Sequence, residues 1–282
     1  MAGTLTVCAT PIGNLGDLSP RALEALKAAD LIAAEDTRHT RGLLTHFDIH
    51  VPMLSCHKDN ESDRSEEIIQ RLEEGANIVL VSDAGTPAVS DPGEILVRKC
   101  RERGIPVTAI PGPCAFVTAL SMSGMPSRRF VFEGFLPSAS RERKERIGLL
   151  AAETRTVLLY EAPHRLKKTL QELLEAWGNR DIAIARELTK IHEELVLTTL
   201  AEAVTRYGET EPRGEYVLIV GGADPARMAE EKRAGYESLT LTEHMALYPE
   251  LPPKEAMKRV AADRGLSRRD VYEGLLKEKE NG

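Results

Sequence analysis

The sequence predicts an α/β protein with two α/β domains and a small C-terminal helical module, and three observations carry this prediction. Short apolar, β-branched runs alternate with amphipathic helical stretches from Leu5 to Ile110, which is typical of a mostly parallel sheet covered on both faces. The alternation restarts after Met125-Pro126, and beyond Gly221-Gly222 the composition becomes helical and charged. We therefore expect domains at residues 1–124 and 125–225 and a helix-turn-helix-like module at 236–282.

The first domain is predicted to alternate strands with helices. Its four predicted strands are Leu5–Ala9, Leu31–Ala34, Asn77–Val81 and Pro106–Ile110. Ser19-Pro20 opens the first helix, because serine caps helix N-termini and proline suits the first helical position. Two later helices end at Gly75 and Gly104, and a short buried helix follows the turn Pro111–Ala115.

The second domain is predicted to be richer in strands, and the module is predicted to be helical. The strands expected there are Phe130–Glu133, Thr156–Tyr160, Asp181–Arg186, Glu194–Thr198 and Glu215–Val220, with a helix at about His164–Trp177. Three short helices are expected in the module. Ser267 and Asp270 form a capping-box pattern there, and Gly265 ends the preceding helix.

The loop Ser82–Gly93, which follows the apolar run Asn77–Val81, is the first candidate binding site. Ligands of open α/β sheets bind beyond the carboxyl ends of the strands. Asp83 can accept hydrogen bonds from a ligand, and Gly85 lets the backbone approach closely. We expect Asp83, Ala84 and Gly85 to contact a ligand, the alternative being an ordinary strand-to-helix turn. Asp91 is predicted to be the N-cap of the next helix, with Pro92 at its first helical position.

A second polar cluster, Glu35–His39, also stands at the end of a predicted strand. A helix start capped by Thr37 explains part of this cluster but not Arg38 and His39, so both a helix terminus and a ligand site remain open. The loop Thr10–Asp17 contains two glycines but no GxGxxG pattern. The dinucleotide-binding fingerprint is therefore absent.

Composition limits the partners and the compartment. The net charge is −7, so any nucleic-acid contact must come from local basic patches. The four cysteines show no CxxC pair and no zinc-like histidine spacing, so we expect no metal, no disulfide framework and a cytoplasmic location. No signal peptide is expected, and prolines interrupt the uncharged run Gly104–Ser127, so no membrane association is expected.

Seven segments, in order along the chain, resemble the tetrapyrrole methylase-like family of S-adenosylmethionine-dependent methyltransferases, and in particular its branch that acts on small-subunit rRNA. The matching segments are Ala9–Asp17, Ala34–Thr40, Ser82–Gly93, Pro111–Ala115, Phe132–Pro137, Glu187–Glu194 and Arg213–Gly222. The resemblance implies two α/β domains with the cofactor cleft between them, and usually a homodimer. It also implies 2′-O-methylation of a cytidine ribose in the decoding region of 16S rRNA, within the small ribosomal subunit.

The resemblance also implies a set of cofactor-binding residues for S-adenosylmethionine. Carried over position by position, they are Pro11, Asp83, Ala84, Gly85, Val89, Cys114, Ala115, Tyr160, Leu188 and Gly214. The first seven belong to the first predicted domain and the last three to the second. The reaction that the family performs needs no metal.

The charged loop Glu187–Glu194 offers candidate bases for a ribose hydroxyl, which is a weak nucleophile. We hypothesise that Lys190 or Glu193 accepts the proton. A lysine base at neutral pH needs a pKa lowered by about three units from ~10.4, which requires burial without a close carboxylate. Glu193 opposes such a shift, so Lys190 could instead orient a phosphate, and an ordinary surface connection is a further alternative.

Basic runs offer candidate RNA contacts. Six basic side chains between residues 128 and 146 are predicted to bind RNA: Arg128, Arg129, Arg141, Arg143, Lys144 and Arg146. Lys254–Arg269 carries a second run with six basic and two acidic residues. The alternative for each run is a solvated helix face. Strand alternation favours the core for Phe130 and Phe132.

Two rival functions remain open. One is methylation of a tetrapyrrole precursor, although a basic helical tail has no obvious use with a small macrocycle. The other is a ligand-sensing regulator that binds nucleic acid through the C-terminal module. Such a regulator would bind the methyl donor without turnover.

Overall fold

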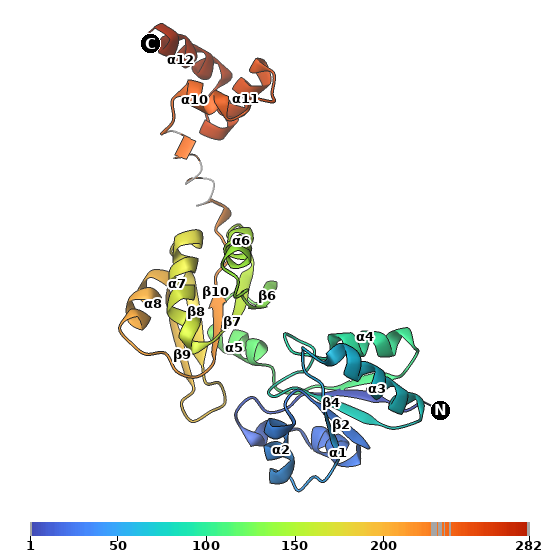
Figure 1. Cartoon of the computed structure of the whole chain (residues 1–282). Coiled ribbons are helices and arrows are strands. Elements are labelled where there is room, and N and C mark those ends of the chain that lie inside the picture. The colour runs from blue at the N-terminus through green and yellow to red at the C-terminus, as the bar shows by residue number, and fades with distance from the viewer. Residues whose placement is uncertain (1, 227–229, 231–232, 234, 237, 281–282) are drawn as a thin grey trace. The chain divides into compact units, whose positions relative to one another are not determined.

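The computed structural model describes residues 2–280 except 227–229, 231–232, 234 and 237 (Figure 1). The chain divides into two compact units, Met1–Gly222 and Ala223–Gly282. Within the described part, no helix is both long and apolar enough to cross a membrane. Residues 237, 281 and 282 of the predicted module lie outside the described residues.

The first unit contains an all-parallel sheet of five strands in the order β3-β2-β4-β1-β5. Its strands are β1 (Leu5–Cys8), β2 (Leu31–Ala34), β3 (Met53–Ser55), β4 (Ile78–Val81) and β5 (Val107–Ile110). The central strand β4 is buried on both faces: Ile78 and Leu80 belong to one apolar cluster, and Val79 and Val81 to another. Side chains alternate across a strand, so a strand covered on both faces must be apolar throughout.

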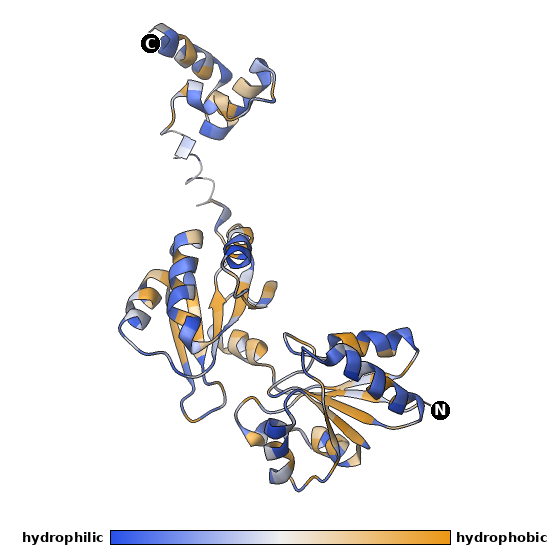
Figure 2. Ribbon diagram, viewed as in Figure 1, coloured by the Kyte–Doolittle hydropathy of each residue, from blue (hydrophilic) through white to orange (hydrophobic). Residues whose placement is uncertain are grey.

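A second sheet in the same unit is mixed, in the order β6-β7-β10-β8-β9. Its strands are β6 (Phe130–Phe135), β7 (Thr156–Glu161), β8 (Asp181–Arg186), β9 (Glu194–Thr199) and β10 (Tyr216–Val220). Only β6 and β7 pair in parallel, and the other neighbours are antiparallel. The strands of both sheets are mainly hydrophobic, whereas the helices mix hydrophobic and hydrophilic residues (Figure 2).

The helices of this unit are α1 (Pro20–Ala28), α2 (Thr37–His46), α3 (Glu61–Glu73), α4 (Glu94–Glu102), α5 (Ala115–Ser123), α6 (Ser140–Leu150), α7 (Pro163–Trp177) and α8 (Leu200–Gly208), with a 3₁₀ turn η1 at Leu15–Asp17. Ala119 and Leu120 of α5 pack against Leu158 and Val217 of the second sheet. The chain therefore crosses to the second sheet between β5 and α5, ahead of the boundary that we predicted at residue 124.

The C-terminal unit contains the three expected short helices, α10 (Leu241–Ala246), α11 (Pro253–Arg264) and α12 (Arg268–Glu280). Its small core joins Leu241, Val260, Ala261 and Val271. Gly265 ends α11 in a left-handed conformation, as predicted. The Ser267 hydroxyl accepts the Asp270 N–H, and the Ser267 N–H donates to the Asp270 carboxylate, which forms the expected capping box.

Two elements were not predicted from the sequence, and the cap of α2 differs from the prediction. Strand β3 was missed because it is a three-residue edge strand with half-buried side chains. Helix α8 was missed although it begins with a reciprocal capping box between Thr199 and Glu202, which is visible as T-x-x-E in the sequence. Asp36, rather than Thr37, caps α2 through its side chain.

Candidate functional site

A pocket of about 470 Å³ lies within the first unit, lined by segments from both sheets. This volume is within the range of small-molecule sites. Eight of the ten residues predicted to bind the cofactor line it: Asp83, Ala84, Gly85, Val89, Cys114, Ala115, Tyr160 and Leu188. Pro11 and Gly214 do not line it, but their neighbours Ile12 and Glu215 do. The fold thus brings most of the cofactor-binding residues implied by the resemblance to a single pocket.

The loop after β4 forms one wall, and its backbone is fixed close to the pocket. Thr10 and Gly85 exchange two backbone hydrogen bonds of 2.8 and 3.1 Å, and the Thr86 hydroxyl donates to the Pro113 carbonyl at 3.0 Å. Gly85 has a φ of +86°, and a Cβ added there would lie 3.3 Å from Ile12 and 3.6 Å from the Pro113 oxygen. Both conformation and space therefore favour glycine.

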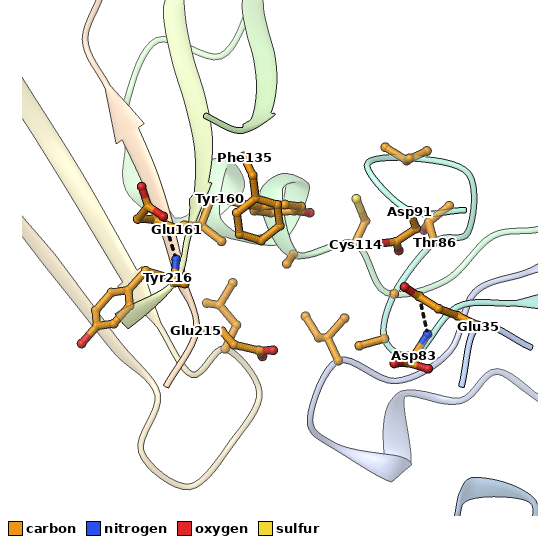
Figure 3. A pocket seen from close by; sticks show the side chains of 18 of the residues that line it. Glu35, Asp83, Thr86, Asp91, Cys114, Phe135, Tyr160, Glu161, Glu215 and Tyr216 are labelled. Carbon is orange, nitrogen blue, oxygen red and sulfur yellow. Dashed lines mark hydrogen bonds between the residues drawn. The ribbon is translucent and has the colours of Figure 1, made fainter. Parts of the chain in front are cut away.

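The same wall is acidic, and its carboxylates come from two strands. The Asp83 carboxylate accepts the Asp36 N–H at 3.0 Å, and the Glu35 carboxylate accepts the Asp83 N–H at 3.4 Å. Figure 3 shows Glu35, Asp83 and Asp91 on the same side of the opening. Burial raises the pKa of Glu35, and the Asp83 charge adds to that rise. The segment Glu35–His39 was predicted to be either a helix terminus or a ligand site. It is partly each, because α2 starts within it and Glu35 lines the pocket.

The prediction that Asp91 caps a helix is wrong. Helix α4 begins at Glu94, and its N-cap is Gly93, which has a φ of 129° that suits only glycine. Asp91 instead lines the pocket. Burial raises the pKa of Asp91 to about 6, with the charges of Glu35 and Asp83 acting in the same direction and a hydrogen bond from Ser82 opposing them. A carboxyl group with such a pKa can exchange a proton near neutrality.

The opposite wall is aromatic and apolar. Phe135 and Tyr160 stand there with ring centroids 5.5 Å apart, and the Phe116 N–H donates to the Tyr160 hydroxyl at 3.3 Å. Behind them Phe132 stacks on Phe116 at 4.0 Å. Phe132 is partly buried, but Phe130 is 37% exposed, so the core prediction for Phe130 is wrong. Figure 3 shows the Tyr216 ring and the Glu161 carboxylate turned away from the opening.

Two close approaches connect loops of the first sheet to the second sheet, one at a loop and one at the irregularity within β6. A Cβ on Gly13 would lie 2.5 Å from Cγ of Lys190, and a Cβ on Gly134 would lie 2.8 Å from Oγ of Ser90. Four of the five non-glycine residues with positive φ in the described chain also stand in these loops: Ala88, Ser90, Glu187 and Thr189. Such conformations cost about 1–3 kcal/mol each and cluster at functional sites.

The prediction of Lys190 as a proton acceptor is wrong. Its ammonium lies 2.9 Å from Glu187 and 3.2 Å from Glu215. Burial acts to lower the pKa of Lys190, but the two carboxylates outweigh it, so the pKa is raised. Glu193 is exposed, does not line the pocket, and accepts the Thr189 N–H at 2.6 Å.

The basic residues predicted to bind RNA have different environments. Arg128, Arg129, Arg141 and Lys144 are exposed, and Arg146 pairs with Glu133. Arg143 is 3% exposed, and its guanidinium donates to Glu172 and to Thr169, each at 2.6 Å. The prediction that Arg143 contacts RNA is therefore wrong, because its side chain lies between α6 and α7.

Several pocket residues had no local signal in the sequence. Glu161, Ala162 and Pro163 line the pocket, yet they lie outside the matching segments and have an ordinary sequence context. Ile12, Thr86, Phe135, Tyr216 and Val217 lie inside the matching segments and could have been included on that ground. Across the described residues, no cluster of three or more metal-binding side chains is present, and all four cysteines are unpaired.

Fold and site together define a class of protein. Residues 4–204 match the family described as Tetrapyrrole (Corrin/Porphyrin) Methylases, and the chain belongs to that family. Within the family it is 49% identical over 278 residues to the Ribosomal RNA small subunit methyltransferase I of Xylella fastidiosa (strain Temecula1), covering 96% of this chain and 98% of that protein. The proteins of the same name from Synechocystis and Escherichia coli O157:H7 are each 45% identical, covering 99% and 98% of this chain and 100% and 96% of theirs.

Solved structures with this fold are more distant. The methyltransferase CobJ superposes with a TM-score of 0.61 at 20% identity, covering 79% of this chain and 95% of that one. A uroporphyrin-III C-methyltransferase from Thermus thermophilus, complexed with S-adenyl homocysteine, has a TM-score of 0.54 at 18% identity, covering 78% and 92%. These similarities agree with the α/β fold predicted from the sequence.

Proposed function

We propose that the chain transfers a methyl group from S-adenosylmethionine to the ribose 2′-hydroxyl of a cytidine in the decoding region of 16S rRNA. The observation that carries this proposal is similarity of 45–49% over nearly the whole chain to proteins named Ribosomal RNA small subunit methyltransferase I. Because the similarity includes the C-terminal unit, it extends beyond the part shared with the tetrapyrrole enzymes.

The residues around the pocket suit S-adenosylmethionine. Its sulfonium and ammonium groups are cationic, and the pocket lining contains Glu35, Asp83 and Asp91 but no lysine, arginine or histidine. Gly85 leaves room beside its backbone, and Phe135 and Tyr160 offer aromatic faces of the kind on which a purine stacks. When bound, the cofactor supplies an electrophilic methyl group.

The residues of this chain would orient the reactants and accept a proton. Asp83 and Gly85 hold one side of the site through the loop after β4, while Leu188 and Tyr160 exclude water from the other. Orientation of this kind supplies a large part of the rate enhancement in a displacement reaction. We assign the proton of the ribose hydroxyl to the Asp91 carboxylate, since its pKa of about 6 leaves it ionised but basic at neutral pH.

Asp91→Asn is expected to lower kcat by about 10²- to 10⁴-fold and to weaken S-adenosylmethionine binding far less, because Glu35 and Asp83 remain in the pocket. The wild-type rate should rise as pH increases through about 6, and this dependence should disappear in the variant. Single-turnover rates across pH measure both effects. Glu193→Gln tests the sequence-based alternative, and Asp59→Asn is a control at an exposed carboxylate. If only Glu193→Gln lowers the rate, the assignment to Asp91 is wrong.

The same shift predicts the sign of a stability effect. A carboxyl whose pKa is raised on folding contributes stability below the unfolded pKa of about 4, and that contribution is lost as pH rises through about 6. Asp91→Asn should therefore be more stable than wild type at pH 8, by about 1 kcal/mol after allowance for solvent screening. Thermal melts at pH 4 and pH 8 measure the difference, and a less stable variant at pH 8 would contradict it.

The decisive test of function is incubation of the protein with radiolabelled S-adenosylmethionine and small ribosomal subunits from cells that lack the gene. Label should enter 16S rRNA at a single cytidine, and its ribose position can be mapped by resistance to alkaline cleavage. Uroporphyrinogen III serves as the competing acceptor. Label in the macrocycle instead, or cofactor binding without turnover, would favour the tetrapyrrole enzyme or the regulator.

The proposal includes a homodimer and a cytoplasmic location. The dimer follows from the resemblance to the family, and the unpaired cysteines suit a reducing compartment. Sedimentation equilibrium measures whether the chain forms a dimer. Fractionation of cells tests the cytoplasmic location.

A further inference from the structure

We infer that the first unit holds a second site, a basic pocket that binds phosphodiester groups of RNA. It is formed by Arg128, Arg129 and Arg155 with Thr154 and Gly222, and its volume is about 550 Å³. This inference rests on the proposed RNA substrate. The basic pocket would hold that RNA at a distance from the pocket of about 470 Å³ described above, which is called the methyl-transfer pocket below.

The basic pocket lies at the opposite end of strands that also reach the methyl-transfer pocket. Strands β6 and β7 are parallel, with Phe130 opposite Thr156 at their beginning and Phe135 opposite Tyr160 near their end. Phe135 and Tyr160 line the methyl-transfer pocket, whereas Thr156 lines the basic pocket. At about 3.3 Å per residue, the two sites are about 15 Å apart. A single small acceptor cannot fill both, but a polynucleotide can.

The two pockets carry opposite charge. No aspartate or glutamate lines the basic pocket, whereas five carboxylate residues and no cation line the other. Arg128 and Arg129 are exposed and form no ion pair among the described residues. The phosphates of a bound RNA are thus attracted to the far end of the strands rather than to the acidic walls. Guanidinium groups suit phosphate because their planar donors can bind two oxygens at once.

Arg155 is held in place rather than free. Glu153 accepts hydrogen bonds from its Nε at 2.8 Å and its Nη2 at 2.7 Å. This pair neutralises much of its charge, so Arg128 and Arg129 supply the net positive charge. The exposed Thr154 hydroxyl adds a neutral donor at the same rim.

The floor of the basic pocket is closely packed. A Cβ on Gly222 would lie 2.0 Å from the Thr154 carbonyl oxygen, so the two backbones are in contact. The buried Thr156 hydroxyl donates to the Pro126 carbonyl at 2.6 Å, which fixes the segment that leads to Arg128. A fixed floor with two unpaired arginines at its edge needs little rearrangement to bind a phosphate.

The test uses the full-length double variant Arg128→Ala/Arg129→Ala and small ribosomal subunits that lack the modification. Each lost phosphate contact should reduce the slope of log affinity against log salt by about 0.7 to 0.9, so the double variant should lose about 1.4 to 1.8. The corresponding loss of affinity is about 10- to 100-fold at 0.1 M salt. S-adenosylmethionine affinity, measured by calorimetry, should remain at the wild-type value.

The matched control is Arg21→Ala/Lys27→Ala, which removes two exposed cations from α1. An unchanged slope in the Arg128/Arg129 variant, or an equal change in the control, would overturn the inference. If the alanine variant melts early, Arg128→Lys/Arg129→Lys decides: affinity should fall at a constant slope, and wild-type affinity would overturn the inference. If the wild type binds the subunits more tightly than the Arg128/Arg129 variant but transfers no methyl group to them, the proposed function is wrong and the inferred RNA site stands.

Discussion

Gly85→Val is expected to reduce the affinity for S-adenosylmethionine at least about 100-fold, or roughly 2.7 kcal/mol. The backbone at Gly85 has a φ of +86°, and the new side chain would start 3.3 Å from Ile12 and 3.6 Å from the Pro113 oxygen. A β-branched residue is strained in that conformation, and its methyl groups would occupy the pocket. Isothermal titration calorimetry with the cofactor measures the loss directly.

Gly104→Val provides the matched control for this variant. Gly104 has a φ of +67°, also in the left-handed region, but a Cβ added there meets nothing within 4 Å. The control should therefore lose stability from backbone strain, of about 1–3 kcal/mol, yet bind the cofactor normally. Equal affinities of the two variants for the cofactor would mean that the loop after β4 is not part of its site.

Arg143→Ala is expected to destabilise the first unit by about 3–5 kcal/mol. The guanidinium of Arg143 bonds to Glu172 and Thr169 and lies 3.7 Å from the fully buried carboxylate of Glu161. Its removal leaves that carboxylate with Arg165 as its remaining cation, at 3.2 Å. The melting temperature should fall by about 6–20 °C, since a unit of this size shifts about 2–4 °C per kcal/mol.

Lys144→Ala is the control for this substitution, since Lys144 is the next residue of α6 and is exposed. Its melting temperature should stay within about 2 °C of the wild type, because exposed substitutions usually change stability by less than about 0.5 kcal/mol. Wild-type stability of Arg143→Ala, combined with weaker RNA binding, would instead restore Arg143 as an RNA contact.

The burial of Arg143 could have been inferred from helical periodicity. Arg143, Ile147 and Leu150 follow one another at spacings of four and three residues, and all three are buried on one face of α6. The number of charges in the segment does not distinguish the buried Arg143 from the exposed Arg141 and Lys144. The carboxylates that pair with Arg143 come from β7 and α7, which no count within α6 reveals.

Asp91 illustrates a limit of local rules. An Asp-Pro pair before a helical stretch predicts an N-cap, but the helix begins only after Gly93. The side chain of Asp91 then lies close enough to Glu35 and Asp83 for their charges to raise its pKa. Asp83 stands in the same loop as Asp91, but Glu35 follows β2, so only the pairing of β2 with β4 in the sheet brings Glu35 to Asp91.

The sequence by itself determined most strands, most helices and the α/β class, because apolar periodicity and capping residues act over a few neighbouring positions. Its matching segments also contained most residues of the pocket. Only the tertiary structure decided that α5 packs on the second sheet, that Lys190 is neutralised by Glu187 and Glu215, and that Arg143 is buried. The charge state and availability of an ionisable group depend on side chains brought near it by folding, and some of those partners, such as Glu215 for Lys190 and Glu161 for Arg143, are distant in the sequence.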